Sequence, residues 1–211
     1  MKTINIMNPQ VQSILEEFEH FFINQPIELT NNQLDGDNPD YWTGDEFLES
    51  IIEDHDGSPK NACSYCLKPD HYNGLDSQYK IVYNDINDRL SLELGVSHSA
   101  LSQMYPPDGF IAWHTNENAV GHNLIFTWSE TGDGYFEYLD KEGKKVRMQD
   151  KVGWSCKAGY FGTREDNEHV YHCARTNCKR ITLSYVMADT SDRMRPLTDW
   201  WDDCVEHIQR G

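Results

Sequence analysis

A histidine and an asparagine two residues apart, His114 and Asn116, form a pair whose side chains could bind one metal ion together. They end a run of mostly aromatic and aliphatic residues, 110–116, which predicts a β-strand, and residues 106–109 supply a turn before it. Residues two apart in a strand point to the same face, so the imidazole and the amide oxygen would reach a common point. A His-x-Asn pair is common and usually inert by itself, so a metal site requires further ligands from elsewhere in the chain.

Two more histidines, His169 and His172, precede a second β-rich run that begins near Arg180. They lie three residues apart, and a regular strand sends residues with an odd separation to opposite faces. We therefore expect only one of them to face the same point as His114.

The run that begins at Arg180 has an unusual polar face. Arg180, Thr182 and Ser184 share this face of the predicted strand, while apolar residues occupy the other. If the polar face is buried, its groups need a partner. A carboxylate ligand would supply one, because arginine binds carboxylates through two charged hydrogen bonds and a hydroxyl can add a third. The alternative, a solvent-facing side of an edge strand, fits these residues equally well.

In order and spacing, residues 100–188 resemble the 2-oxoglutarate/iron(II)-dependent oxygenases. That family carries His-x-Asp/Glu on an early strand, a distal histidine before the last strand, and a following Arg or Lys that holds the far carboxylate of 2-oxoglutarate. The resemblance implies a double-stranded β-helix with flanking helices. It also implies Fe(II) bound by His114, Asn116 and His172, and 2-oxoglutarate bound by Tyr105, Arg180, Thr182 and Ser184.

Two positions of this motif need a separate argument, the distal histidine and the third ligand. Tyr171-His172 resembles the aromatic-histidine step that often carries the distal ligand, so we predict His172 as the ligand and His169 as a surface or hydrogen-bonded histidine. Asn116 departs from the family, because a neutral amide stands where the carboxylate is expected. Halogenases and aspartyl/asparaginyl hydroxylases of the family also lack this carboxylate. We therefore expect a metal site whose third position is weak or filled by water.

The activity that the resemblance implies is hydroxylation of a C–H bond with 2-oxoglutarate and O2, releasing succinate and CO2. The substrate could be a small molecule or a side chain of a basic protein or peptide, and we favour the protein or peptide. One alternative is a catalytically inactive jelly-roll binding or structural protein, which Asn116 favours. Another is a cupin-like metal protein that does not use 2-oxoglutarate. The face that begins at Arg180 argues against both.

Composition narrows the function further. The formal net charge of −17 argues against a nucleic-acid partner, because phosphate contacts need clustered Lys and Arg. No apolar run approaches the roughly 20 residues of a membrane helix, and the first residues are too polar for a secretory signal. We therefore expect a cytoplasmic protein. The chain is also similar to proteins encoded by marine phages, which would place it in the cytoplasm of a host cell.

The hydrophobic pattern predicts a mainly β fold with flanking α-helices. Apolar residues at helical spacing indicate helices over 9–23, 43–55, 78–94 and 197–210, with an irregular connection over 24–41. Eight short β-rich runs indicate a jelly-roll, over 101–105, 110–115, 123–129, 134–139, 145–148, 154–161, 169–174 and 180–187. We predict a single domain over 1–211, with a helical N-terminal support region (1–98), a β-helix core (99–190) and a C-terminal helix (191–211).

Cys63 and Cys66 form the Cys-x-x-Cys of the chain, which has six cysteines in all. Such a pair can be half of a zinc site or a redox couple. No second Cys-x-x-Cys follows at zinc-finger spacing, so we interpret the two as ordinary thiols in a loop, while zinc completed by ligands from elsewhere in the fold stays open.

Overall fold

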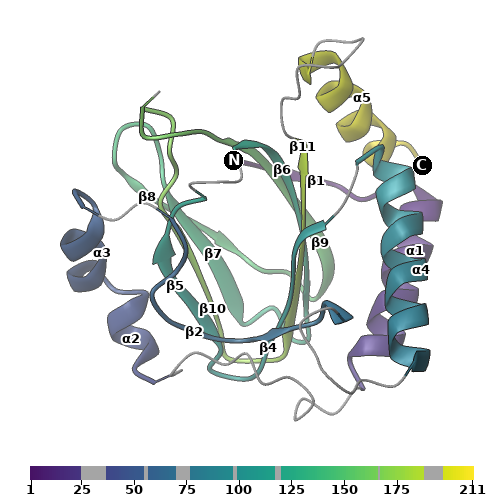
Figure 1. Cartoon of the computed structure of the whole chain (residues 1–211), viewed down its shortest axis with the longest axis horizontal. Coiled ribbons are helices and arrows are strands. Elements are labelled where there is room, and N and C mark those ends of the chain that lie inside the picture. The colour runs from purple at the N-terminus through teal and green to yellow at the C-terminus, as the bar shows by residue number, and fades with distance from the viewer. Residues whose placement is uncertain are drawn as a thin grey trace.

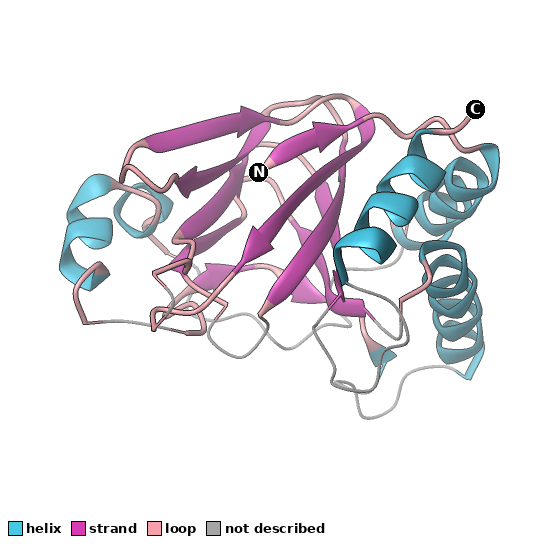
Figure 2. Cartoon of the chain, turned by 90° about the horizontal axis from the view of Figure 1, so that it is seen from above, coloured by secondary structure: helices cyan, strands magenta, loops and turns pink. Residues whose placement is uncertain are grey.

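A computed structural model of the chain describes residues 1–24, 37–54, 57–69, 77–96, 99–116, 120–165, 167–187 and 197–211. The strands in these ranges form two sheets, with helices outside them (Figure 1; Figure 2). The larger sheet has the order β1-β9-β6-β11-β4-β3, and the smaller has β2-β5-β10-β7-β8. The strands are Lys2–Ile4 (β1), Ala62–Cys63 (β2), Tyr65–Cys66 (β3), Ser99–Tyr105 (β4), Phe110–His114 (β5), Gly121–Ser129 (β6), Gly134–Leu139 (β7), Lys145–Gln149 (β8), Gly153–Phe161 (β9), His172–Thr176 (β10) and Arg180–Met187 (β11).

From β4 to β11 the chain crosses repeatedly between the two sheets. Strands β4, β6, β9 and β11 belong to the larger sheet, and β5, β7, β8 and β10 belong to the smaller. The pairings among these strands are antiparallel. This is the arrangement of a jelly-roll, or double-stranded β-helix, so the predicted fold class is confirmed.

Helices cover the outer faces of both sheets. Pro9–Phe22 (α1), Ser77–Leu94 (α4) and Leu197–Gln209 (α5) lie beside the larger sheet, while Pro39–Trp42 (α2) and Asp45–Ile51 (α3) lie beside the smaller one (Figure 1). These bounds agree with the predicted helices to within a few residues, except that α3 is shorter. Helix α2 falls where the sequence predicted the end of an irregular connection, whose residues 25–36 lie outside the described ranges.

Helix α1 shows why these helices form where they do. The Asn8 side chain accepts hydrogen bonds from the backbone N–H groups of Gln10 and Val11, and Pro9 occupies the first turn. The apolar stripe of the helix then packs on the larger sheet together with α4 and α5. Buried members of this cluster include Val11, Leu15, Phe18, Phe22, Ile86, Leu90, Ile181, Leu183, Tyr185, Val205 and Ile208.

The N-terminal region differs from the predicted helical support region because β1, β2 and β3 join the sheets. Strand β1 pairs with β9, and the two-residue strands β2 and β3 pair with β5 and β4. The division of the chain into one domain with three regions stays a prediction. Within the described ranges, no helix is long and apolar enough to cross a membrane.

Candidate metal and cosubstrate site

A cavity of about 470 Å³ lies between the two sheets. Both sheets contribute to its wall, and so does the segment that begins at Gly57. All of the site residues that the sequence predicted line this cavity, namely Tyr105, His114, Asn116, His172, Arg180, Thr182 and Ser184. The fold thus brings together residues that are up to about eighty positions apart in the chain. Their binding roles stay predictions.

His114 and His172 lie side by side on neighbouring strands of the smaller sheet and line the cavity. They are opposed partners in the pairing of β5 with β10, and their ring centroids lie 4.1 Å apart. The Nδ1 atom of His114 lies 2.8 Å from the carbonyl oxygen of Ala112, and that of His172 lies 2.9 Å from the carbonyl oxygen of Val170. A carbonyl only accepts, so each Nδ1 carries the proton and Nε2 is the atom through which either ring would bind a metal.

A β-bulge in the pairing of β5 with β10 places His114 in this position. The register pairs His172 with His114 but Ala174 with Ile111, so β5 has one residue more than β10 over this stretch. Ile111 and His114 therefore both line the cavity. The intervening Ala112 and Trp113 belong to the cluster packed against α2 and α3.

The surroundings of His172 are apolar. Its ring lies 5.0 Å from the Phe161 ring and 5.5 Å from the Phe136 ring, measured between centroids. Burial lowers the pKa of His172 to about 4, although its hydrogen bond to the Val170 carbonyl opposes the shift. The imidazole is therefore neutral at neutral pH, which is the protonation state that binds metals.

His169 does not line the cavity, although the sequence left it as a second candidate. Its ring lies 5.4 Å from that of Tyr171, and its buried Nδ1 atom has no hydrogen-bond partner among the described residues. Of the two histidines, His172 is the one beside His114.

Asn116 lies just beyond β5, which ends at His114, and its half-buried side chain lines the cavity. Two imidazole nitrogens and an amide oxygen form a neutral donor set that suits a divalent metal such as iron, with less affinity than a set that contains a carboxylate. No group of three or more His, Cys, Asp or Glu side chains suited to a metal occurs within the described part of the chain. The two adjacent imidazoles fit Fe(II) as a pair of ligands, and Asn116 as a weak third ligand stays a prediction.

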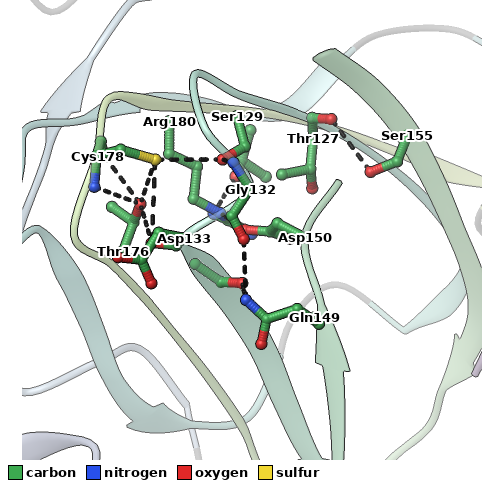
Figure 3. Close-up of polar contacts among 12 residues, drawn as sticks. Thr127, Ser129, Gly132, Asp133, Gln149, Asp150, Ser155, Thr176, Cys178 and Arg180 are labelled. Atoms are coloured by element: carbon green, nitrogen blue, oxygen red, sulfur yellow. Dashed lines mark hydrogen bonds and ion pairs between the residues drawn. The ribbon is translucent and has the colours of Figure 1, made fainter. Parts of the chain in front are cut away.

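Arg180 is a buried lining residue of the cavity on β11, in the larger sheet. It is 1% exposed, which excludes the solvent-facing alternative for its strand face. Its Nε atom donates to Asp150 Oδ2 at 2.8 Å (Figure 3). Its Nη1 atom donates to Thr182 Oγ1 at 2.6 Å, and its guanidinium carbon lies 5.2 Å from the Tyr105 ring centroid. Next along the strand, the Ser184 hydroxyl lies 3.4 Å from the Asn123 amide oxygen. Arg180, Thr182 and Ser184 therefore form a continuous polar strip inside the cavity.

Asp150 and Lys157 lie behind the cavity wall, where Asp150 contacts Arg180 and Lys157 contacts Asp150, and they were not predicted. The Lys157 ammonium donates to Asp150 Oδ1 at 2.9 Å, so Asp150 bridges Lys157 and Arg180. Burial would raise the pKa of Asp150, but the charges and hydrogen bonds of its two cationic partners hold that pKa below its ordinary value. One feature of the sequence could have indicated this ion pair, namely a lysine on the inward face of an otherwise largely apolar strand.

The position of Asp150 also depends on Gly134. The backbone N–H of Asp150 donates to the Gly134 carbonyl oxygen at 2.8 Å. A Cβ atom at Gly134 would lie 2.8 Å from Asp150 Oδ2, closer than such atoms approach without a shift. Glycine at this position thus allows the carboxylate to reach Arg180.

The cysteines lie outside the cavity wall. Cys63 and Cys66 are buried cysteines on β2 and β3, which belong to different sheets, so the loop predicted for them contains two short strands. Cys178 is in a different environment, close to the hydroxyls of Ser129 and Thr176 (Figure 3). Burial would raise the pKa of Cys178, but hydrogen bonds with Ser129, Thr131 and Thr176 lower it to about 7. A zinc site at the Cys-x-x-Cys is not formed among the described residues.

Comparison with protein-family models and with curated protein sequences finds no match. Similar solved structures include a prolyl-4-hydroxylase from Pseudomonas putida, at 12% identity and TM-score 0.38, covering 69% of this chain and 82% of that one. A full-length Neurospora crassa protein, solved in complex with alpha-KG, has 11% identity and TM-score 0.42 and covers 89% and 74%. A cupin domain from Bordetella pertussis has 16% identity and TM-score 0.27 and covers 44% and 85%. At such low identities and TM-scores, the similarity assigns no family, activity or substrate to this chain.

Proposed function

We propose that this protein is a 2-oxoglutarate- and Fe(II)-dependent oxygenase that hydroxylates a C–H bond, with release of succinate and CO2. The observation that carries the proposal is the presence, in one cavity, of two opposed imidazoles and a buried guanidinium. The imidazoles suit a divalent metal, and the guanidinium suits the far carboxylate of a 2-oxo dicarboxylic acid.

The residues of the chain have distinct roles in this proposal. His114 and His172 would hold Fe(II) through Nε2, with Asn116 or a water molecule as the third ligand. When bound, Fe(II) would supply the activation of O2 and the oxidation of 2-oxoglutarate. Arg180, Thr182, Ser184 and Tyr105 would bind and orient the cosubstrate. Phe136 and Phe161 would limit the access of water to the ring of His172.

The charge of the residues that line the cavity indicates which kind of substrate group could enter it. Arg180 is the one lining residue with a permanent charge among those the structure describes. The rest of the wall offers small, apolar or neutral polar groups, such as Ser58, Ser64 and Ile111. We therefore propose that the part of the substrate that enters the cavity is uncharged. The net charge of −17 would attract a basic protein or peptide carrying such a group, or a small molecule could supply it directly.

A second candidate function is a non-catalytic jelly-roll protein that binds a metal or a carboxylate. The neutral Asn116, in place of a carboxylate ligand, is the observation that favours it. On either proposal the predicted location is the cytoplasm, or the cytoplasm of a host cell if the chain is encoded by a phage.

Succinate formation separates these two functions. Purified protein is incubated with Fe(II), 2-oxoglutarate and O2, with and without peptides or cell extract as a source of substrate. An oxygenase produces succinate that depends on all three components and is lost in His172→Ala. Binding of Fe(II) and 2-oxoglutarate without any succinate, in the presence of each substrate source, would instead support the non-catalytic protein.

A further inference from the structure

Arg180, Asp150 and Lys157 form a buried ionic cluster behind the wall of the cavity. Their side chains are 1%, 0% and 4% exposed. Each oxygen of the Asp150 carboxylate accepts from a different cation, Oδ2 from Arg180 and Oδ1 from Lys157. Lys157 also lies 3.4 Å from Thr127 Oγ1. Arg180 and the Thr182 that it contacts line the cavity, whereas Asp150 and Lys157 do not.

The cluster contains two cations and one carboxylate, so it carries a net charge of +1 when Lys157 is protonated. In the described part of the chain, no second carboxylate forms an ion pair with Arg180 or Lys157. Tyr105, the other titratable group beside Arg180, has a pKa raised by burial and is therefore neutral. An uncompensated buried charge is costly, and a ligand carboxylate in the cavity would balance it.

The hydrogen bonds of Arg180 leave a route for that carboxylate. Its Nε atom binds Asp150 and its Nη1 atom binds Thr182, and neither of these bonds uses Nη2. Since Lys157 occupies Oδ1 of Asp150, the carboxylate accepts from Arg180 through Oδ2. Lys157 thereby fixes the orientation of Asp150, and Asp150 fixes that of the guanidinium.

The protonation of Lys157 is coupled to the charges around it. Burial lowers its pKa, and although the attraction of Asp150 opposes the shift, the repulsion of Arg180 adds to it. An anion bound beside Arg180 would favour the protonated ammonium. Carboxylate binding and the charge of Lys157 would thus stabilise each other.

We propose that Lys157 is a positioning and specificity-determining residue, which acts through Asp150 to make the cavity select an oxo acid with a second carboxylate. The proposal rests on the proposed function, because it concerns the cosubstrate of the same site. It extends that function by assigning the preference for a dicarboxylate to a three-residue cluster and not to Arg180 alone.

The test compares two ligands that differ only in the far carboxylate. Affinities for 2-oxoglutarate and for 2-oxopentanoate are measured by anaerobic calorimetry on the Fe(II)-loaded full chain. In Lys157→Met the cluster is neutral, and we expect the preference for 2-oxoglutarate to fall by about tenfold or more. Lys157→Arg keeps the charge and should restore the preference. Lys144→Met removes a charge from an exposed lysine and should leave the preference unchanged.

A preference in Lys157→Met equal to that of the wild type would overturn the proposal, because a purely structural lysine would alter both affinities alike. A second measurement needs neither iron nor a variant that folds. Glutarate should raise the melting temperature of the metal-free wild type more than pentanoate does, and equal effects of the two would also overturn the proposal. A preference that is lost in Lys157→Met, without any succinate formation by the wild type, would support the cluster's role and reject the oxygenase function alone.

Discussion

His114 and His172 are directly opposed across the antiparallel pairing of β5 with β10, and their ring centroids lie 4.1 Å apart. Each ring donates its Nδ1 proton to a backbone carbonyl two residues earlier in the chain. The two imidazoles are therefore held in a fixed tautomer and a fixed orientation before any metal arrives. Such preorganisation lowers the cost of binding, since the rings need not be ordered by the metal.

Replacing either of these histidines should abolish Fe(II) binding while the jelly-roll still folds. His114→Ala and His172→Ala each remove one of two strong ligands, and Asn116 alone cannot compensate. Anaerobic titration of Fe(II) into each variant provides the measurement, with circular dichroism as the test of folding. His169→Ala is the matched control, because this ring lies outside the cavity wall, and it should bind iron as the wild type does. Undiminished iron affinity in both cavity variants would show that the metal site is elsewhere or absent.

Asn116→Asp should tighten Fe(II) binding. The substitution is nearly isosteric, and it adds an anionic oxygen ligand to a donor set that is otherwise neutral. Competition with a metal chelator at neutral pH gives the ratio of the two dissociation constants. Equal or weaker binding by the variant would mean that residue 116 does not face the metal.

Asp150→Asn should destabilise the protein by about 3–5 kcal/mol, because it leaves two buried cations without their carboxylate. Urea unfolding at neutral pH measures the free energy, and the exposed Asp54→Asn serves as the control. A loss no larger than that of the control would mean that the cluster contributes little to stability.

The effect of Asp150→Asn should also depend on pH in a defined direction. Because the folded-state pKa of Asp150 is lowered, its stabilising contribution is complete above the ordinary carboxyl pKa of about 3.9. The contribution falls as the pH decreases through the lowered pKa, where the carboxyl becomes protonated in the folded protein. The stability difference between wild type and variant should therefore be constant at neutral pH and shrink in strong acid. A difference that grows as the pH falls would contradict the assigned shift.

Much of the fold could be predicted from the sequence because its signals are local. The eight core strands are short β-rich runs, several of them separated by turn clusters, and α1 and α4 carry apolar stripes at helical spacing. By contrast, β1, β2 and β3 have two or three residues each, too few to show a period. They form because neighbouring strands offer backbone partners, which no local pattern records.

Some features of the candidate site could likewise be predicted from local sequence, and others could not. Arg180, Thr182 and Ser184 could be placed on one face by simple alternation, and the structure lines the cavity with that face. The bulge that turns both Ala112 and Trp113 outward depends on pairing with β10 and leaves no mark in the sequence. The bridge from Asp150 to Arg180 joins residues thirty positions apart on different segments, and no local pattern connects them.

The proposed function depends most on Fe(II) and 2-oxoglutarate occupying the same cavity. Anaerobic calorimetry of 2-oxoglutarate binding, with and without Fe(II), tests this directly in the wild type and in Arg180→Ala. We expect iron to strengthen 2-oxoglutarate binding, and Arg180→Ala to weaken it by about 1.5–3 kcal/mol through the loss of a charged hydrogen-bonded contact. Affinity for 2-oxoglutarate that is unaffected both by iron and by the removal of Arg180 would contradict the proposed function.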